Sequence, residues 1–416
     1  MSARAASSIV LVGALLLGIP WGAGAAAPFA APNGDAYGDF PVASEVRLGG
    51  DETATRMVVD FSQKIDMRAF TLANPYRVII DLPQVVFRFP PKTGEGGRGL
   101  IKAFRYGLMM TGGSRIVIDL TRPARVEKSF VLDATNDQPA RFVLDLAAVD
   151  RDAFMRTIAL ENRVREPPAV VKPQPKSDAR PIIVLDPGHG GIDNGTKAAS
   201  GEMEKTIVLE FALLLRDKIE KAGKYHVVMT RSDDTFVALA DRVQFARAQQ
   251  ASLFISIHAD ALPRGEGDAQ GATVYTLSET ASDSEAARLA ETENRADVIA
   301  GVDLTYQPDD VADILIDLAQ RETKSYSVQF ARGLIDSMRT AARMHKNSLK
   351  SAGFRVLKAP DIPSVLIELG YVSNRQDIKS LTSADWREHT ADSIAKAIDR
   401  FFITRLAGSG RGNGQN

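Results

Sequence analysis

Three side chains suited to metal binding or acid–base chemistry follow directly after apolar runs that are typical of buried strands. They are His189 after residues 182–185, His258 after 253–257, and Glu368 after 364–367. In open α/β sheets, functional groups collect just beyond the carboxyl ends of the strands. We therefore expect these three side chains to lie together at one edge of a sheet.

Metal binding is the chemistry that such a set supports. Zinc favours tetrahedral sites with nitrogen and oxygen ligands, and a catalytic zinc site keeps one position for water. The chain contains no cysteine and only five histidines, so a metal must be held by histidine and carboxylate side chains. His189 lies within Asp186-Pro-Gly-His-Gly-Gly191, where the glycines let the backbone turn sharply and leave the metal side open.

Each candidate also has an interpretation without catalysis. A glycine-rich turn after a strand can bind a phosphate, but the chain has neither a GKS/T nor a G-x-G-x-x-G pattern there. A single buried histidine is usually a core residue whose hydrogen bonds are satisfied. Glu368 is harder to explain in this way, because an ionisable group leading out of a buried run costs free energy without a partner. The other histidines are expected to be structural or on the surface, with His226 at a strand start and His345 and His389 on polar helical stretches.

The second half of the chain alternates between strand and helix patterns. Strands are predicted at 182–185, 227–230, 253–257, 274–277 and 364–367, and helices at 205–220, 238–248, 323–344 and 391–402. This alternation predicts an α/β fold over residues 181–402, with a mostly parallel twisted sheet and helices on both faces.

Residues 38–150 have a different pattern and predict a small all-β sandwich. An arginine, an apolar run and an aspartate recur four times, at 56–61, 77–82, 115–120 and 141–146. Each copy has the apolar middle and charged ends of a largely buried strand. The copies fall into two pairs, which indicates a duplicated unit with two packed sheets. No residue here has evident catalytic chemistry, so we expect any function of this region to be binding.

The remaining segments have the composition of signals and connections. Residues 1–25 combine Arg4, a short apolar run and a small-residue cleavage pattern, which predicts a secretory signal peptide and an exported, soluble protein. A retained membrane anchor is the alternative, although the run is shorter than the roughly 20 residues that span a bilayer. Residues 151–180, with four prolines in their second half, predict a linker, and 407–416 predict a disordered tail. The formal net charge of −1 gives no general attraction to nucleic acid or to anionic membranes.

Four short motifs, in the same order along the chain, resemble the motif set of zinc N-acetylmuramoyl-L-alanine amidases, periplasmic enzymes that separate daughter cells. The motifs are Asp186-Pro-Gly-His-Gly-Gly191, Gly201-Glu-Met-Glu-Lys205, Ser256-Ile-His-Ala259 and Ile367-Glu-Leu-Gly-Tyr-Val-Ser-Asn374. Two positions depart from the family pattern, since Asp260 stands where asparagine is common and Tyr371 where phenylalanine is common. The resemblance covers essentially the whole predicted α/β region.

This resemblance implies roles for the central residues. Carried over by position, His189, Glu204 and His258 become the ligands of one Zn2+ ion, and Glu368 becomes the catalytic carboxylate. Glu202 is a competing carboxylate, but Glu204 is the one that the family motif matches. The implied reaction is hydrolysis of the amide bond between N-acetylmuramic acid and L-alanine in peptidoglycan. Glu368 would take the proton of the attacking water and deliver it to the leaving amine.

The resemblance also implies targeting and regulation. Residues 38–150 resemble the AMIN domain, which attaches envelope amidases to peptidoglycan or other septal components. The segment 279–322 corresponds to an insertion whose helix covers the active site of division amidases until a partner protein displaces it. A carboxylate on that helix can occupy the open zinc position, with Glu293 the first candidate and Glu291 the second. The implied partner is an envelope activator of the LytM-domain type, and the implied location is the periplasm, with recruitment to the division septum. A solvated surface helix is the alternative for residues 284–299.

Two other functions remain open at this point. One is a different zinc hydrolase of cell-wall peptides, such as a carboxypeptidase, which the order of the motifs argues against. The other is a non-catalytic cell-wall-binding protein with an inactive hydrolase domain. Such a protein would lack at least one central residue, whereas all four are present.

Overall fold

The computed structural model describes residues 40–110, 112–135, 138–162, 180–261, 270–302 and 314–409. The predicted signal peptide at residues 1–25 and the proline-rich part of the predicted linker lie outside these ranges. None of the helices within them combines the length and the apolarity that crossing a membrane requires.

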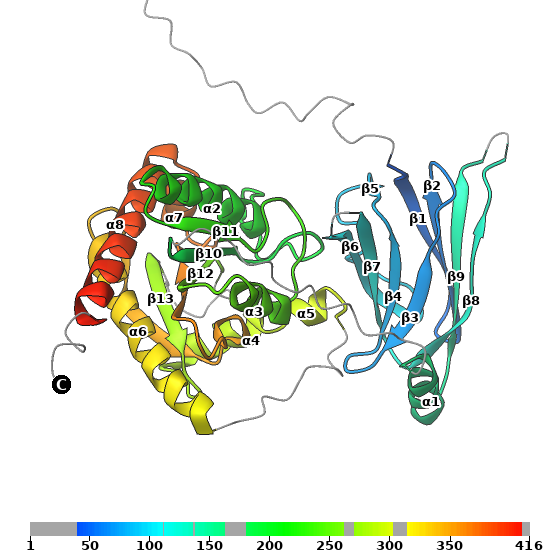
Figure 1. The fold of residues 1–416 in the computed structure, drawn as a ribbon. Coiled ribbons are helices and arrows are strands. Elements are labelled where there is room, and N and C mark those ends of the chain that lie inside the picture. Colours follow the sequence, from blue (N-terminus) through cyan, green and yellow to red (C-terminus); the bar gives the residue numbers. More distant parts are fainter. Residues whose placement is uncertain are drawn as a thin grey trace, which may run out of the picture. The chain divides into compact units, whose positions relative to one another are not determined.

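The N-terminal region is all-β, as predicted, and forms two sheets (Figure 1). One sheet has the strand order β5-β1-β2-β9-β8, and the other has the order β3-β4-β7-β6. The strands are β1 (Val42–Gly50), β2 (Ala54–Phe61), β3 (Arg68–Leu72), β4 (Arg77–Pro83), β5 (Val86–Phe87), β6 (Ile101–Met110), β7 (Gly113–Leu120), β8 (Ala124–Leu132) and β9 (Ala140–Ala148).

The four sequence repeats form interior strands of these sheets. β2 pairs with β9 in one sheet and β4 pairs with β7 in the other, both antiparallel. Met57, Val59 and Phe61 alternate along β2 and are at most 1% exposed, because every second side chain enters the shared apolar core. The prediction of a sandwich with two packed sheets is confirmed.

The first part of the predicted linker is helical instead. Arg151–Asn162 forms helix α1, and the Asp150 carboxylate accepts a hydrogen bond from the Ala153 amide at 2.7 Å. Phe154 is fully buried and meets Tyr76 edge to face, with ring centroids 5.1 Å apart. The capping aspartate and the aromatic contact stabilise a helix where the composition had indicated a spacer.

The described parts of residues 180–409 form an α/β fold around a sheet with the strand order β11-β10-β12-β15-β13-β14. Neighbouring strands are parallel, except that β13 runs antiparallel to β15. The predicted mostly parallel sheet is therefore confirmed. The strands are β10 (Ile182–Pro187), β11 (His226–Met229), β12 (Leu253–His258), β13 (Ala272–Leu277), β14 (Met344–Ala352) and β15 (Ser364–Glu368).

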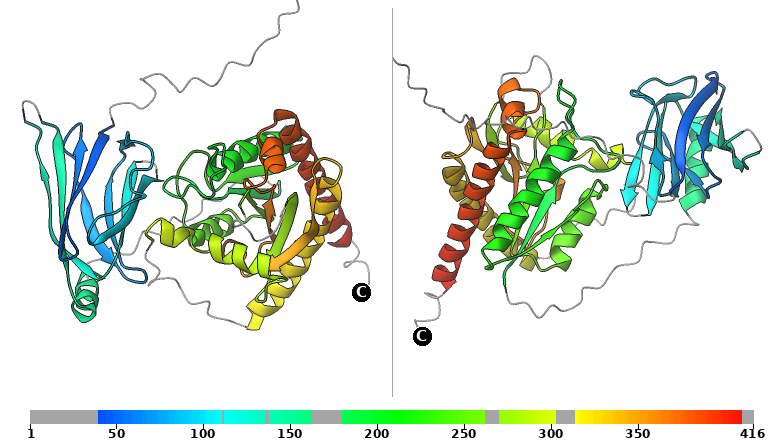
Figure 2. Two further views of the ribbon diagram at one scale, coloured as in Figure 1. Left: turned by 180° about the vertical axis from the view of Figure 1, so that it is seen from behind. Right: turned by 90° about the horizontal axis from the view of Figure 1, so that it is seen from above.

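Helices cover both faces of this sheet (Figures 1 and 2). α2, α6 and α8 bury the face that carries Ile255, whereas α3 and α4 pack over the face that carries Phe254. Figure 2 shows the green α2 beside the red α8. The helices are α2 (Glu204–Lys221), α3 (Leu239–Ala248), α4 (Ser284–Glu293), α5 (Ala296–Ile299), α6 (Ile314–Met338), α7 (Arg375–Leu381) and α8 (Ala384–Ser409), with a 3-10 turn at Arg355–Leu357.

Two predicted helices have wrong ends. The helix predicted at 323–344 is α6, which ends at Met338, and the chain then enters the edge strand β14. The strand is largely polar, so it has no apolar run that would predict it. His345 consequently lies in a strand, not on a helix, and is 6% exposed. The closing helix α8 runs through Ser409, so the first residues of the predicted disordered tail at 407–416 are helical.

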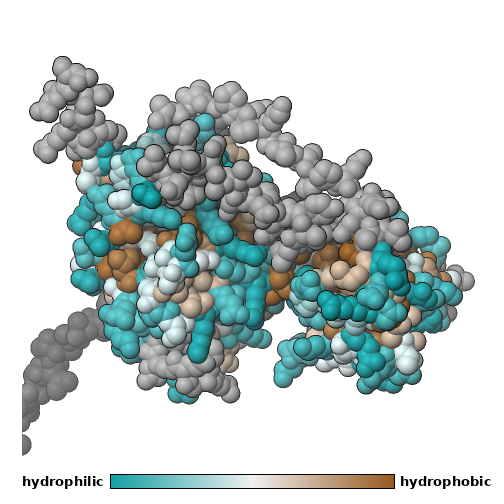
Figure 3. Space-filling view, turned by 90° about the horizontal axis from the view of Figure 1, so that it is seen from below, coloured by the Kyte–Doolittle hydropathy of each residue, from teal (hydrophilic) through white to brown (hydrophobic). Residues whose placement is uncertain are grey.

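Apolar side chains are mostly withdrawn from the surface of the described residues. The large hydrophobic residues that are exposed there are Phe40, Phe130, Leu132, Met155 and Ile403. Figure 3 shows mostly hydrophilic residues on the face that it presents, with apolar residues in smaller groups. The buried hydrophobic residues of the described ranges form three clusters.

Candidate metal centre

The centre is built at the carboxyl edge of the sheet. His258 is the last residue of β12 and Glu368 is the last residue of β15, and the two are direct neighbours in the parallel register. Both residues are buried, at 4% and 0% exposure. The predicted meeting of these two side chains at a strand edge follows from the shared direction of the two strands.

His189 reaches the same edge from the loop after β10. Its backbone φ of 58° lies in the left-handed region, which is strained for a residue with a side chain. Arg242 stabilises this conformation, because its Nη2 donates to the His189 carbonyl at 2.8 Å. At Gly188, a Cβ atom would come within 2.3 Å of the His258 ring, so only glycine lets the loop approach this closely.

Glu204 completes the set from the first residue of α2 and is fully buried. Its Oε1 accepts a hydrogen bond from the Ala259 amide and its Oε2 accepts one from the Thr196 amide, both at 2.9 Å. Burial by itself raises the pKa of this carboxyl, but the imidazoles of His189 and His258 outweigh it and hold the pKa well below its ordinary value. Glu204 is therefore an anion in the centre, whereas the Glu202 side chain pairs with the Ser200 hydroxyl outside it.

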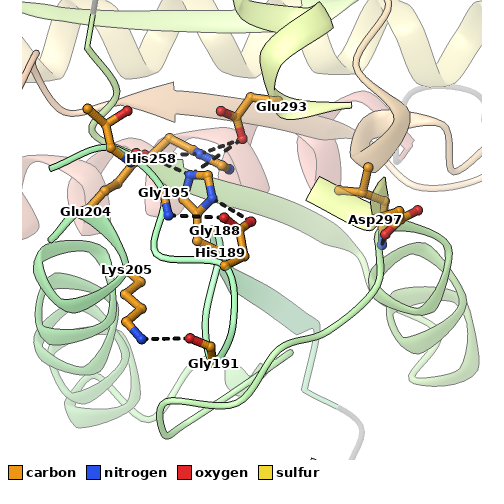
Figure 4. A network of polar contacts seen from close by, with 12 residues as sticks. Gly188, His189, Gly191, Gly195, Glu204, Lys205, His258, Glu293 and Asp297 are labelled. Carbon is orange, nitrogen blue, oxygen red and sulfur yellow. Dashed lines mark hydrogen bonds and ion pairs between the residues drawn. The ribbon is translucent and has the colours of Figure 1, made fainter. Parts of the chain in front are cut away.

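The donor atoms of His189, Glu204 and His258 lie within 4.8 Å of one another (Figure 4). His189 Nε2 is 3.2 Å and His258 Nδ1 is 3.3 Å from Glu204 Oε1. Both nitrogens are buried and neither makes a hydrogen bond. A buried polar atom without a partner costs free energy, and a cation shared by the three side chains would satisfy all of them. Two nitrogens and one oxygen are also the donors that zinc prefers.

Asp193 orients one of these rings. Its Oδ2 lies 2.9 Å from His189 Nδ1, so that nitrogen carries a proton and the ring is held with Nε2 facing the centre. Burial raises the pKa of the Asp193 carboxyl. The charge on His189 and the hydrogen bond between the two side chains lower this pKa by more, so it lies below its ordinary value. Sequence reasoning missed Asp193, although its position four residues after the histidine was a usable signal.

Asp186 and two arginines hold in place the loop that carries His189. Arg242 Nη1 donates to Asp186 Oδ1 at 2.8 Å, and both residues are at most 2% exposed. Burial raises the pKa of Asp186, but Arg242 and the hydroxyls of Thr230 and Ser256 more than offset this, so the pKa lies below its ordinary value. Arg231 Nη2 donates to the Gly188 carbonyl at 2.7 Å. Buried cations thus hold the backbone that carries His189.

Glu368 has the environment of a proton carrier. Its Oε2 accepts a hydrogen bond from the Asp260 amide at 3.0 Å, and its Oε1 is buried without a hydrogen-bond partner. Burial, followed by the nearby carboxyl groups of Glu204, Asp260 and Glu293, raises the pKa of Glu368 well above its ordinary value. A raised pKa brings the carboxyl closer to the range in which it can both accept and release a proton near neutral pH.

The insertion places Glu293 against the metal donors. The Glu293 Oε2 atom is 3.1 Å from His258 Nδ1 and 3.7 Å from His189 Nε2, and the residue is 5% exposed. Glu291, the second candidate, has a side chain that is 66% exposed and pairs with Arg295. Side chains that are two residues apart on a helix point in directions about 200° apart around its axis, so the two glutamates cannot both face the centre. The structure brings Glu293 to the donors and leaves Glu291 outside.

Comparison with known proteins gives the same assignment to the two regions. The family model for N-acetylmuramoyl-L-alanine amidase matches residues 183–400, and the AMIN domain model matches residues 45–149. The chain is 34% identical to the N-acetylmuramoyl-L-alanine amidase AmiC of Escherichia coli O6:H1 over 376 residues, which is 86% of this chain and 88% of the relative.

Two further relatives agree with this match. The chain is 33% identical to AmiC of Neisseria meningitidis serogroup B over 88% of this chain and 91% of the relative. It is 35% identical to AmiA of Escherichia coli K12 over 62% of this chain and 89% of that protein.

Proposed function

Since the chain belongs to the family of N-acetylmuramoyl-L-alanine amidases, which act on peptidoglycan, we propose that it is a zinc enzyme whose active site is closed at rest by its own insertion. It would cut the amide bond between N-acetylmuramic acid and L-alanine. The observation that carries this proposal is the buried set of His189, Glu204 and His258, whose two unpaired ring nitrogens face one carboxylate oxygen.

His189 Nε2, Glu204 Oε1 and His258 Nδ1 are the atoms that would hold the ion. A zinc ion in such a site lowers the pKa of water toward neutrality and polarises the carbonyl of the amide. The protein contributes the orientation of the ligands. Asp193 sets the tautomer of His189, and the two backbone amides on Glu204 keep its carboxylate turned toward the histidines.

Glu368 would carry the proton between water and the leaving group. Its unpaired Oε1 is available to accept the proton of the attacking water, while the Asp260 amide holds Oε2 in place. The same carboxyl group would then donate the proton to the amine of L-alanine as the amide bond breaks. The raised pKa supports both halves of this transfer.

Glu293 would keep the site closed by occupying the position that water and substrate need. Its Oε2 lies 3.1 Å from His258 Nδ1 and 3.7 Å from His189 Nε2. The insertion, at about residues 279–322, would therefore act as a gate that an envelope activator of the LytM-domain type opens. The β region at 38–150 would direct the enzyme to peptidoglycan at the division septum, where the periplasmic enzyme would separate daughter cells.

Digestion of purified sacculi by the zinc-loaded full chain, followed by mass spectrometry, tests the reaction. We expect free stem peptides and intact glycan strands, because the amide that joins the two is the bond cut. Trimmed peptides that remain attached to muramic acid would instead show a carboxypeptidase. A protein that binds sacculi and releases nothing, even with an activator and in a variant lacking Glu293, would show a non-catalytic binding protein.

Replacing Asp193 by asparagine is expected to weaken zinc affinity about tenfold, because partners that orient a histidine ligand contribute on this scale. The amide can present an N–H group to His189 Nδ1 and thereby favour the wrong tautomer. Competition with a chromophoric chelator measures the affinity. Glu202→Gln, a change of equal charge on the side chain that lies outside the donor set, is the control and should bind zinc as the unchanged protein does. Equal affinity of Asp193→Asn would remove Asp193 from this role.

A further inference from the structure

Helix α4 makes a second contact with the rest of the α/β region, at the opposite end of the helix from Glu293. We propose that Glu285, in the first turn of α4, forms a latch with Lys350 and Tyr371 that keeps the gate closed. The latch rests on the proposed function, since it regulates the same site that Glu293 closes. It is a separate contact, made by different residues to a different part of the catalytic fold.

The latch consists of an ion pair and a hydrogen bond to one carboxylate. Glu285 Oε2 lies 2.8 Å from Lys350 Nζ, and Glu285 Oε1 accepts a hydrogen bond from the Tyr371 hydroxyl at 3.0 Å. His345 Nε2 lies 3.9 Å from the same Oε2. Lys350 and His345 come from β14, and Tyr371 comes from the segment after β15, so the carboxylate joins α4 to β14 and to that segment.

Burial makes this contact stronger than an ordinary surface ion pair. The Lys350 side chain is only 2% exposed, and that of Glu285 is 24% exposed. Among the described residues, the carboxylates within 4 Å of Lys350 Nζ are Glu285 and Asp283, the latter at 3.3 Å. Both lie at the start of the insertion. Withdrawal of α4 would therefore separate the Lys350 ammonium group from both carboxylates, and breaking an ion pair that is largely buried costs free energy.

The latch and Glu293 act at opposite ends of one rigid element. Glu285 and Glu293 are eight residues apart in α4, which corresponds to roughly 12 Å along the helix axis. Asn294 adds a contact at the far end, since its amide donates to the Gly353 carbonyl at 2.9 Å and its oxygen accepts from the Arg355 amide at 2.8 Å. Two attachments to one helix reinforce each other, because the second forms within the same molecule once the first is made.

Tyr371 connects the latch to the segment that carries the proton carrier. It follows Glu368 by three residues and is 1% exposed. Its hydroxyl gives this segment a direct hydrogen bond to Glu285 on α4.

Glu285→Gln in the zinc-loaded full chain tests the latch, with dye-labelled sacculi as substrate and no activator. The amide keeps the shape of the side chain but loses the charge that pairs with Lys350, so we expect the basal rate to rise about tenfold, the scale of one hydrogen-bonded charge. Glu291→Gln is the matched control, because it makes the same change on the exposed face of the same helix. Its basal rate should equal that of the unchanged protein. Tyr371→Phe should give a smaller rise of about threefold, since it removes the hydrogen bond from the hydroxyl but leaves the ion pair between Glu285 and Lys350.

Hydrogen exchange of the α4 amides provides a readout that does not depend on activity. Amides of residues 286–293 should exchange faster in Glu285→Gln than in Glu291→Gln, while the exchange of the central strands stays unchanged and so excludes general unfolding. Equal exchange in the two variants would overturn the latch. A Glu293→Ala variant measured in parallel separates the two proposals. If Glu293→Ala raises the basal rate and Glu285→Gln does not, the latch is wrong and the gate stands; if Glu293→Ala has no effect, the gate itself is wrong.

Discussion

Glu368→Gln is expected to lower the turnover number about 1000-fold while the protein keeps its zinc. The amide has the shape of the carboxyl group and can still accept the hydrogen bond from the Asp260 amide, which is 3.0 Å from Oε2 in the native site. It cannot take a proton from water or return one to the leaving amine. Zinc content by mass spectrometry, together with release of stem peptides from sacculi, measures both parts of the expectation.

The control for this substitution is Glu202→Gln, which makes the same chemical change on a carboxylate of the neighbouring loop that pairs with Ser200. It should leave zinc content and turnover as they are. Full activity of Glu368→Gln at one zinc per chain would exclude Glu368 as the proton carrier. Loss of zinc together with activity would show instead that the residue maintains the metal site.

Glu293→Ala is expected to raise the activity measured without an activator about 100-fold. A site that is closed in about 99% of the molecules loses about that factor, and removal of the closing side chain restores it. The carboxylate is 3.1 Å from His258 Nδ1, so alanine frees the position next to the metal donors. Deletion of residues 280–320 should raise the basal rate in the same direction, because it removes the whole helix. Release of dye from labelled sacculi, at fixed zinc and enzyme concentration, gives the rate.

Glu291→Ala is the control for the gate, because its side chain points away from the donors and pairs with Arg295. Its basal rate should not change. If Glu293→Ala and the deletion both leave the basal rate unchanged or lower it, with zinc bound and the fold intact, autoinhibition by the insertion would be excluded. An activator should accelerate the unchanged protein strongly and the Glu293→Ala variant only weakly, since the variant is already open.

Much of the fold could be predicted because a strand that is buried on both faces has a continuous apolar run in the sequence. β10, β12 and β15 lie inside the sheet and are covered on both faces, so each has a continuous apolar run. The edge strand β14 has no such run, since Lys346, Asn347 and Ser348 fit the end of a polar helix as well as they fit a strand. The break between α4 and α5 was also missed, and both helices fall within one stretch of good helix formers.

Some residues of the candidate site could also be predicted from the sequence, whereas others are explained only by the structure. The types and the strand-end positions of His189, His258 and Glu368 are visible in the sequence, because a strand direction fixes where its last side chain emerges. The selection of Glu204 over Glu202 depended on the family motif, and its physical reason is seen only in three dimensions, where two backbone amides hold one carboxylate and not the other.

The sequence therefore shows which chemistry is available and at which edge of the sheet these groups gather. Which distant side chains meet is fixed only by the folded chain. Glu293 reaches His258 from a helix that lies beyond the next strand of the chain, and Glu285 meets Lys350 although 65 residues separate them, as the numbering shows. Such pairs have no local pattern, because they depend on how the insertion packs back over the sheet, and packing is a property of surfaces that only the folded chain possesses.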